Sequence, residues 1–414
     1  MGSVSFVGAA QILRPPRDRM SHLRGEELRA QTLEPGALAV ADGRISGLEA
    51  DHRAELTVDA GGCALVPGFV DCHTHLPFAG WRAGEYEQKL QGVPYEEIAR
   101  AGGGIKASAR ALDQTPDDEI LAQATGLAGE MLACGTTTLE CKSGYGLSRE
   151  GELRALELAR RLEPEVVQTT LSTALLAHAV PDGYTADSWM DVVEEMMAEV
   201  IELGSVSALD IFVESIAFAN RHLKLMGELA AGAGLALRCH VEQFASHRSV
   251  PVALAAGARS VDHLSMIDRA DIAPLAHAPC AAVLLPAAEF LGAESRAPGR
   301  ELLDAGAIVV LATDANPGTA PVVSMPLVMG LGARLYGWEV REVLGAATLN
   351  AAWTLGLEHD RGSIEVGKRA DLLLLDGPAE MISYRLGHNP VALAFVAGEP
   401  VYVRDEAAAA RLTR

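Results

Sequence analysis

The sequence predicts an α/β fold: a (β/α)8 TIM barrel with a small β-sandwich domain built from both termini. Three observations predict it. The middle of the chain alternates apolar strand-like and helical segments as eight units over roughly 290 residues, close to the ~250 typical of such barrels. Both ends are β-like and rich in glycine turns. Polar residues follow the strand-like segments, where barrel enzymes place catalysis. A doubly wound sheet is the alternative, but no Gly-rich phosphate loop opens the first unit.

The two ends of the chain form the predicted sandwich, over residues 1–66 and 361–414, and residues 67–360 form the barrel. At the N-terminal end "GALAVADGRISGLEA" contains the hairpin signal Asp42-Gly43. At the C-terminal end "GSIEVGKRADLLLLD" and "ALAFVAGEPVYVR" alternate in the same way. We therefore expect one composite domain with the barrel inserted between its halves.

The barrel elements are expected in the following order. The strand in "FVDCHTH" precedes a long Gly-rich loop, Leu76 to about Gln114. Thr115 is the expected N-cap of the next helix, with Pro116 at its first position and Gly135 after its end. The later units begin with the strand-like segments "TTTLECKS", "VVQTTLSTALLAH", "ALDIFVES", "LALRCHVEQ", "SVDHLS", "CAAVLLP" and "GAIVVLATDANPG". Helices are expected among them near Arg149–Leu162, Asp187–Leu203 and Val323–Leu335.

Composition excludes several classes of function. The 414 residues carry a formal net charge of −21, which argues against nucleic acid as a partner because its phosphates would be repelled. No secretion signal or long apolar run is visible, so we expect a cytoplasmic protein with no membrane segment. The 6 cysteines form no C-x-x-C pair and are expected to be buried free thiols.

Two histidines at the end of the first strand suggest a metal site. His73 and His75 are two residues apart, so in an extended segment both imidazoles point the same way, about 7 Å apart. On its own, such a pair faces solvent about as often as it binds a metal. His240, His263 and Asp314 end later strands, and together the five suit zinc or iron better than magnesium. His263 is either a ligand or an outer-shell catalytic group.

Lys142 raises a second possibility, since a lysine that ends a strand can be carbamylated to bridge two metals. We expect an ordinary exposed or ion-paired lysine and one divalent metal, Zn²⁺ or Fe²⁺/Fe³⁺.

Several motifs together resemble the amidohydrolase superfamily: "VPGFVDCHTH", "HVEQ", "DHLS", "LATDANPG" and "GSIEVGKRADLLLLD". Longer stretches, such as "TTTLECKSGYGL" and "LATDANPGTAP", are similar to the members that open 4-imidazolone-5-propanoate to N-formimidoyl-L-glutamate. The resemblance implies a metal-dependent hydrolase with a small carboxylate-bearing substrate and, as in many such barrels, a homodimer.

The resemblance also implies roles for individual residues. The implied metal ligands are His73, His75, His240 and Asp314, and the implied catalytic residues are His263, Asp314 and Gln243. The implied substrate contacts are Arg82, Tyr145, His178, Gln243, Asn316, Gly318 and Thr319. A guanidinium such as Arg82 pairs with a propanoate in bidentate fashion. The alternatives are another amidohydrolase or deaminase with a related cyclic substrate, or a scaffold without activity, which the complete ligand set disfavours.

The chain departs from the family pattern at three places. Val213 stands where we expect cysteine, Gly330 stands where we expect asparagine, and "LLPAAEFLGAESRAP" lacks the expected aromatic residues. We expect these changes at the edge of the pocket and behind it, where they bear on the substrate and leave the metal site intact.

Overall fold

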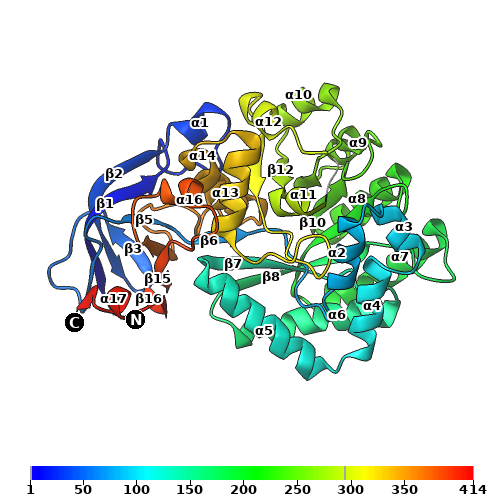
Figure 1. Ribbon diagram of the computed structural model, residues 1–414, viewed down its shortest axis with the longest axis horizontal. Helices are drawn as coiled ribbons and strands as arrows, with labels where there is room; N and C mark the ends of the chain where they lie inside the picture. The colour runs from blue at the N-terminus through cyan, green and yellow to red at the C-terminus, as the bar shows by residue number, and fades with distance from the viewer. Residues whose placement is uncertain (1, 293–294, 414) are drawn as a thin grey trace.

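The computed structural model describes residues 2–292 and 295–413, and its ribbon separates into a barrel and a smaller sheet (Figure 1). The barrel sheet has 8 strands in the order β13-β12-β11-β10-β9-β8-β7-β6, and all neighbouring pairs are parallel. Its strands are β6 (Phe69–Asp71), β7 (Thr136–Lys142), β8 (Thr169–Ala177), β9 (Val206–Val213), β10 (Ala236–Val241), β11 (Ser260–His263), β12 (Ala281–Leu284) and β13 (Ile308–Leu311).

The first and last strands approach each other just beyond their ends. Thr74 and Ala315 form a parallel bridge, and the His75 amide donates to the Ala315 carbonyl at 2.9 Å. The sheet is therefore a nearly closed barrel, and the predicted fold class is confirmed. Because the strands are parallel, their carboxyl ends meet at one rim of the barrel.

Helices cover the outside of the barrel (Figure 1). The helices that follow strands are α5 (Asp117–Ala133), α6 (Arg149–Leu162), the short 3₁₀ helix η1 (Glu163–Glu165), α7 (Ala186–Glu202), α8 (Asn220–Ala233), α9 (Ser249–Ala255), α10 (Arg269–His277), α11 (Pro286–Gly292), α12 (Gly299–Asp304), α13 (Met325–Tyr336), α14 (Val340–Ala347) and α15 (Leu349–Thr354). The predicted helix Arg149–Leu162 is confirmed, and α7 and α13 lie within two residues of their predicted bounds.

The start of α5 corrects one prediction. Pro116 is the N-cap residue, and the Thr115 hydroxyl donates to the Ala111 carbonyl at 2.7 Å instead of capping the helix. Gly135 follows the helix with φ +91°, as expected for a residue after a helix end.

The predicted loop from Leu76 to Gln114 was wrong. It contains α2 (Ala83–Leu90), α3 (Tyr95–Arg100) and α4 (Ile105–Gln114). The glycines that suggested a loop stand mainly between the helices, and Gly104 is the N-cap of α4. Only Ser108 and Leu112 of α4 are buried, so the apolar pattern is too sparse to predict this helix.

Strands from both ends of the chain form the second sheet, of 9 strands, with the path β16-β15-β14-β5-β1-β2-β3 and with β4 and β17 beside it. Its strands are β1 (Val4–Arg14), β2 (Thr32–Ala41), β3 (Arg44–Gly47), β4 (Leu56–Asp59), β5 (Ala64–Pro67), β14 (Leu372–Leu375), β15 (Val391–Val396), β16 (Glu399–Val403) and β17 (Leu412–Thr413). The short helices α1 (Glu26–Arg29), α16 (Met381–Tyr384) and α17 (Glu406–Ala409) accompany them.

Antiparallel pairing of β14 with β5 joins the two ends of the chain. The sheet encloses a hydrophobic core of its own, which includes Phe6, Val58 and Phe395. Asp42 and Gly43 both have positive φ in the β2–β3 hairpin, which confirms the predicted turn. The exact domain limits stay predictions.

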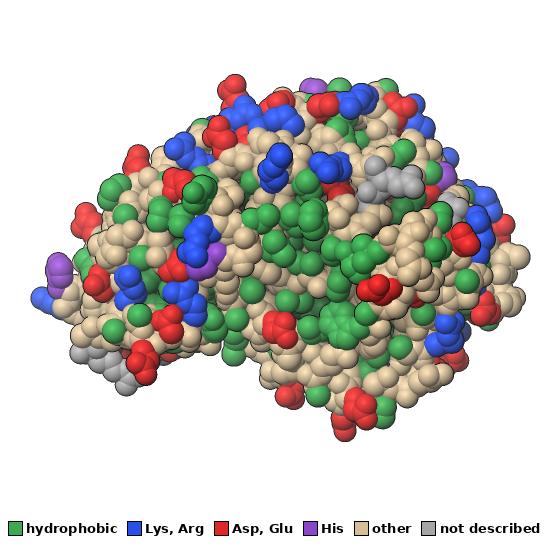
Figure 2. Space-filling view, viewed as in Figure 1, with side chains coloured by type: hydrophobic (Ala, Val, Ile, Leu, Met, Phe, Trp, Pro, Cys, Tyr) green, Lys and Arg blue, Asp and Glu red, His purple; other side chains and the backbone are tan. Residues whose placement is uncertain are grey.

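The cysteines are free thiols, as the sequence predicts. All six thiols are free, and five are buried. Within residues 2–292 and 295–413, no helix is both long and apolar enough to cross a bilayer. Figure 2 shows acidic and basic side chains interspersed over one face, with apolar side chains gathered near its middle.

Candidate active site

One cavity at the carboxyl ends of the strands collects most of the predicted site residues. It is lined by His75, Arg82, Ile105, Tyr145, His178, Phe212, His240, Gln243, Phe244, His263, Asp314, Asn316 and Thr319. The lining comes from seven of the eight strand ends and from the segment of α2–α4, so the cavity exists only in the closed barrel. His73 lies beneath it and is fully buried.

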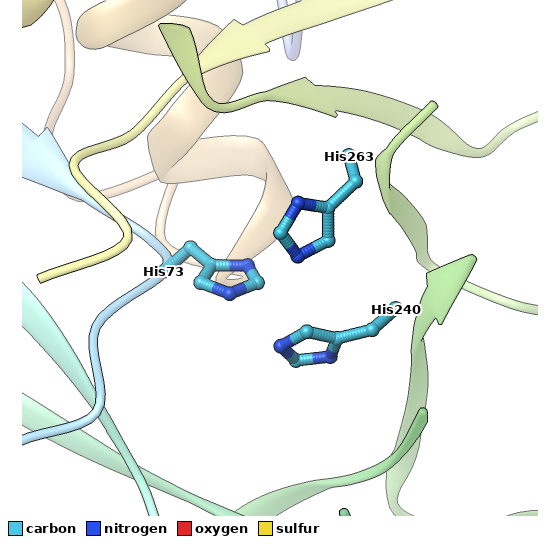
Figure 3. A group of neighbouring side chains, drawn as sticks. All are labelled: His73, His240 and His263. Atoms are coloured by element: carbon cyan, nitrogen blue, oxygen red, sulfur yellow. The ribbon is translucent and has the colours of Figure 1, made fainter. Parts of the chain in front are cut away.

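The imidazoles of His73, His240 and His263 converge from three strand ends (Figure 3). Their nearest nitrogens lie within 4.8 Å of one another, as do one atom each of His73, His75 and Asp314. The Asp314 Oδ1 is 3.4 Å from His73 Nε2 and 3.3 Å from His75 Nε2. Each of these side chains is at most 5% exposed. The arrangement is suited to hold a metal ion.

Two carboxylates behind the imidazoles fix their orientation. His73 Nδ1 is 2.6 Å from Asp262 Oδ2, and His240 Nδ1 is 3.1 Å from Asp210 Oδ1. The Nε2 atoms of both rings are buried without a hydrogen-bond partner among the described residues. A carboxylate that accepts the Nδ1 proton leaves the Nε2 lone pair to point into the site, as in metal-binding histidines.

Burial and neighbouring charges set the charge state of the cluster. Burial lowers the pKa of His75 to about 4 and that of His263 to about 3, so both are neutral near pH 7. Burial and Lys142 act to lower the pKa of His73, but Asp262 and Asp314 outweigh them and raise it to about 9. Burial acts to raise the pKa of Asp314, but the imidazoles of His73 and His75 beside its carboxylate hold it well below its usual range. Asp314 is therefore ionised.

The backbone is strained where the site residues leave their strands. His263 has φ +78° and Asp314 has φ +57°, in the left-handed region that side-chain-bearing residues rarely adopt. Each such residue costs about 1–3 kcal/mol and persists only where surrounding structure enforces it. Strained residues of this kind cluster at active sites and ligand clamps.

Arg82 reaches the cavity from the N-terminal end of α2. Its Nη1 donates to Ser108 Oγ at 3.0 Å, and its Nε is 3.3 Å from Glu85 Oε2. Gly318 lies directly against the guanidinium, because a Cβ at that position would overlap Arg82 Nη2. The glycine predicted to approach the substrate thus makes room for the arginine.

His178 and Tyr145 form an aromatic wall beside His75. The His178 ring stacks on His75 with centroids 5.3 Å apart and an interplanar angle of 15°, and Tyr145 lies 5.3 Å from His178. His178 Nδ1 bonds the Gly144 carbonyl at 3.0 Å, and burial holds the pKa of His178 well below its usual range. The neutral ring therefore keeps Nε2 as an acceptor.

Asn316 organises the loop after β13. Its Oδ1 accepts from the amides of Gly318 and Thr319 at 2.9 and 2.8 Å, and its Nδ2 donates to the Asp314 carbonyl at 2.7 Å. The side chain predicted to contact substrate therefore also shapes the loop that carries Asp314.

The structure corrects the expectation for Gly330 and agrees with it for the segment after β12. Val213 is buried in the barrel core, and a Cβ at Gly330 would meet Leu386 Cδ1 at 2.7 Å, on the outer side of α13. Neither residue lines the cavity. Glu289, in the unusual segment after β12, does border an adjoining cavity with Gln243 and His263.

Asp210 was not predicted from the sequence, and no role was predicted for Asp262. The period of two in a strand could have identified both carboxylates as inward-facing. Asp210 is two positions from Phe212, and Asp262 is two positions from Ser260, and both of these neighbours face inward.

Comparisons with known proteins agree with this geometry. The amidohydrolase family model matches residues 64–401. An imidazolonepropionase from Methylobacterium nodulans is 41% identical over 371 residues, 87% of this chain and 92% of the relative. One from Agrobacterium fabrum is 41% identical over 382 residues, 89% of this chain and 91% of the relative.

Solved structures share the fold at lower identity. A zinc-bound adenosine deaminase from Xanthomonas campestris has a TM-score of 0.66 at 20% identity, covering 98% of this chain and 95% of its own. A triazine hydrolase variant has a TM-score of 0.73 at 17% identity, and the match covers 97% of this chain and 95% of the hydrolase. The strand-end cluster, the barrel and the full-length relatives agree: the chain belongs to the amidohydrolase family and, within it, to the imidazolonepropionases.

Proposed function

We propose that this chain hydrolyses the ring amide of 4-imidazolone-5-propanoate, giving N-formimidoyl-L-glutamate in histidine degradation. Its relatives named imidazolonepropionase match about nine-tenths of the chain at 37–41% identity. The observation that carries the proposal is a buried cluster of four imidazoles and a carboxylate at the cavity that Arg82 also lines.

His73, His75, His240 and Asp314 are the proposed ligands of one divalent cation. The donor set fits, because the Nε2 atoms of His73 and His240 are buried without a hydrogen-bond partner among the described residues, and Asp314 lies beside His73 and His75. Nitrogen-rich sets of this kind favour zinc or iron over magnesium. When bound, such a cation acidifies a water molecule and polarises a carbonyl oxygen.

The ion pairs of Lys142 favour one bound cation over two cations bridged by a carbamylated lysine. Its ammonium is fully buried and lies 2.7 Å from Asp210 Oδ2 and 3.1 Å from Glu140 Oε1. A carbamate there would place a third negative charge beside two carboxylates. The ion-paired lysine expected from the sequence is therefore confirmed, and the exposed alternative was wrong.

Arg82 is proposed to bind the propanoate, since a guanidinium pairs with a carboxylate through two parallel hydrogen bonds. Tyr145 and His178 form the opposite wall, where the neutral imidazole accepts a hydrogen bond from the substrate. Gln243 offers both a donor and an acceptor to the edge of the substrate ring. Thr319 and the Asn316 loop close the cavity beside Arg82.

Asp314 and His263 are proposed to move and stabilise charge during ring opening. Asp314 is ionised, so it accepts a proton from the attacking water and passes it to the leaving ring nitrogen. His263 is neutral and donates an N–H to the oxyanion that develops on the carbonyl. The strained backbone at both residues fixes their positions before substrate binds.

The direct test is an absorbance assay on freshly prepared imidazolone propanoate, together with metal analysis of the purified protein. We expect turnover with about one bound ion per chain, and His240→Ala should lose both metal and activity because it removes one ligand. Failure to turn over this compound, with rapid turnover of another cyclic amide, would contradict the proposed substrate. The homodimer and the cytoplasmic location stay predictions, open to light scattering and cell fractionation.

A further inference from the structure

Five charged side chains fill the barrel interior behind the imidazoles, and we call them the charge chain: Glu140 and Lys142 on β7, Asp210 on β9, Arg238 on β10 and Asp262 on β11. Each is at most 1% exposed. Lys142 lies two residues after Glu140, and Arg238 two before His240, so the strands direct these side chains to the same interior.

The members of the charge chain contact one another in series through the barrel interior. Asp210 binds Lys142 Nζ at 2.7 Å, and Lys142 lies 3.1 Å from both oxygens of Glu140. Glu140 Oε1 accepts from Arg238 Nη1 at 2.5 Å, and Arg238 Nη2 lies 3.7 Å from Asp262 Oδ2. Arg238 also donates to the Cys72 carbonyl at 2.7 Å, next to His73.

The two ends of the charge chain are the carboxylates that hold the imidazoles. Asp210 bonds His240, and Asp262 bonds His73. Glu140 stands at the centre, where it contacts both cations and neither histidine. Thr173 Oγ1 donates to the same Glu140 oxygen, Oε1, whereas Oε2 has no hydrogen-bond partner among the described residues.

Packing alone does not require these charges. Buried ion pairs recover their desolvation penalty only with excellent geometry, and apolar side chains of similar volume often replace them without loss. Four carboxylates and two cations, counting Asp314 with the charge chain, leave a formal net charge of −2 once every imidazole, including His73, has given up its extra proton. A divalent cation balances this charge.

We propose that Glu140 is a positioning residue for the metal site, acting on His73 through Arg238 and Asp262 and on His240 through Lys142 and Asp210. Metal affinity then depends on a carboxylate that touches no ligand. The inference rests on the proposed metal site, and the experiment below separates the two.

The test is Glu140→Gln in the full-length protein, with zinc affinity measured by competition with a chromophoric chelator. We expect zinc to dissociate about 10- to 100-fold more readily, the range found when outer-shell partners are removed. With saturating zinc, KM for substrate should stay within about twofold, because Arg82 and its neighbours are unchanged. Zinc affinity equal to that of the unchanged protein would overturn the inference.

Glu342→Gln is the matched control. Glu342 is also fully buried and binds two arginines, Arg29 at 2.7 Å and Arg300 at 2.9 Å, but it lies outside the barrel on α14. Its substitution should lower the melting temperature and leave zinc affinity unchanged. If both variants weakened zinc binding equally, the effect would be general loss of stability and the inference would fail.

The variant Lys142→Met distinguishes positioning of the histidines from a direct electrostatic effect of the buried charges on zinc. Removing this ammonium makes the interior more negative, so electrostatic attraction alone would tighten zinc binding. Positioning predicts weaker binding, because Asp210 loses the contact that holds it toward His240. Unchanged or tighter binding would refute positioning.

Thr173→Val covers the case in which the charge variants do not fold. It removes one hydrogen bond to Glu140 and keeps every charge, and it should weaken zinc binding by a smaller factor than Glu140→Gln. Unchanged affinity in Thr173→Val would then count against the inference. Should the unchanged protein itself bind no zinc or iron, the proposed metal site fails, whatever the variants do.

Discussion

Gly318 offers a test of the carboxylate site that leaves the proposed metal ligands untouched. A Cβ built at this position overlaps the Nη2, Cζ and Nε atoms of Arg82, so Gly318→Ala must displace the guanidinium or the loop that carries Asn316. Arg82 is only 9% exposed and its Nη1 is held by Ser108, which leaves little room to yield. We expect the guanidinium to lose its alignment with the propanoate.

The size of the effect follows from the contact that is lost. A hydrogen bond to a charged group contributes about 1.5–3 kcal/mol, so losing one of the two in a bidentate pair should raise KM about 10- to 100-fold. The contact is remote from the scissile bond, so kcat should fall less than kcat/KM. Arg82→Ala should raise KM at least as much, since it removes both hydrogen bonds.

Steady-state kinetics with matched metal content measure both parameters. Gly84→Ala is the control, because Gly84 lies on the same helix as Arg82 and a Cβ there meets nothing within 4 Å. That variant should behave like the unchanged protein. A normal KM in Gly318→Ala, or a fall in kcat alone, would refute the assignment of Arg82 to the propanoate.

Two further predictions concern other parts of the site. Gly144→Ala should raise KM and lower the melting temperature, because Gly144 has φ +107° and a Cβ there would lie 2.8 Å from His178 Nδ1; normal kinetics would argue against His178 as a substrate contact. Burial raises the pKa of Glu289 to about 7, so the folded state binds its proton more tightly than the unfolded state does. Stability should therefore fall as pH rises from about 4.5 to 7, by roughly 3 kcal/mol from this group. Glu289→Gln should remove that part of the pH dependence in thermal unfolding at pH 5 and pH 8, and an unchanged difference between the two pH values would contradict the reasoning.

Short-range patterns explain why much of the molecule was predictable. The strand-like segments carry enough apolar residues to be recognised, and Asp42-Gly43 needs only local backbone preferences to form its turn. The helices α2–α4 were missed because Gly102, Gly103 and Gly104 suggested irregular chain, whereas they mark a helix boundary.

The chemical types available at each strand end follow from the sequence, because the period of two in a strand and the parallel order of a barrel fix which residues reach one rim. His73, His75, His240, His263 and Asp314 could be grouped as candidates on that basis, and the family resemblance implied which four of them bind metal. Three contacts could be learned only from the folded protein: Asp262 and Asp210 bond two of these imidazoles, Gly318 lies against Arg82, and Gly330 faces α16 instead of the cavity. Such contacts join residues up to hundreds of positions apart, and their distances depend on how the closed barrel packs, which no local pattern encodes.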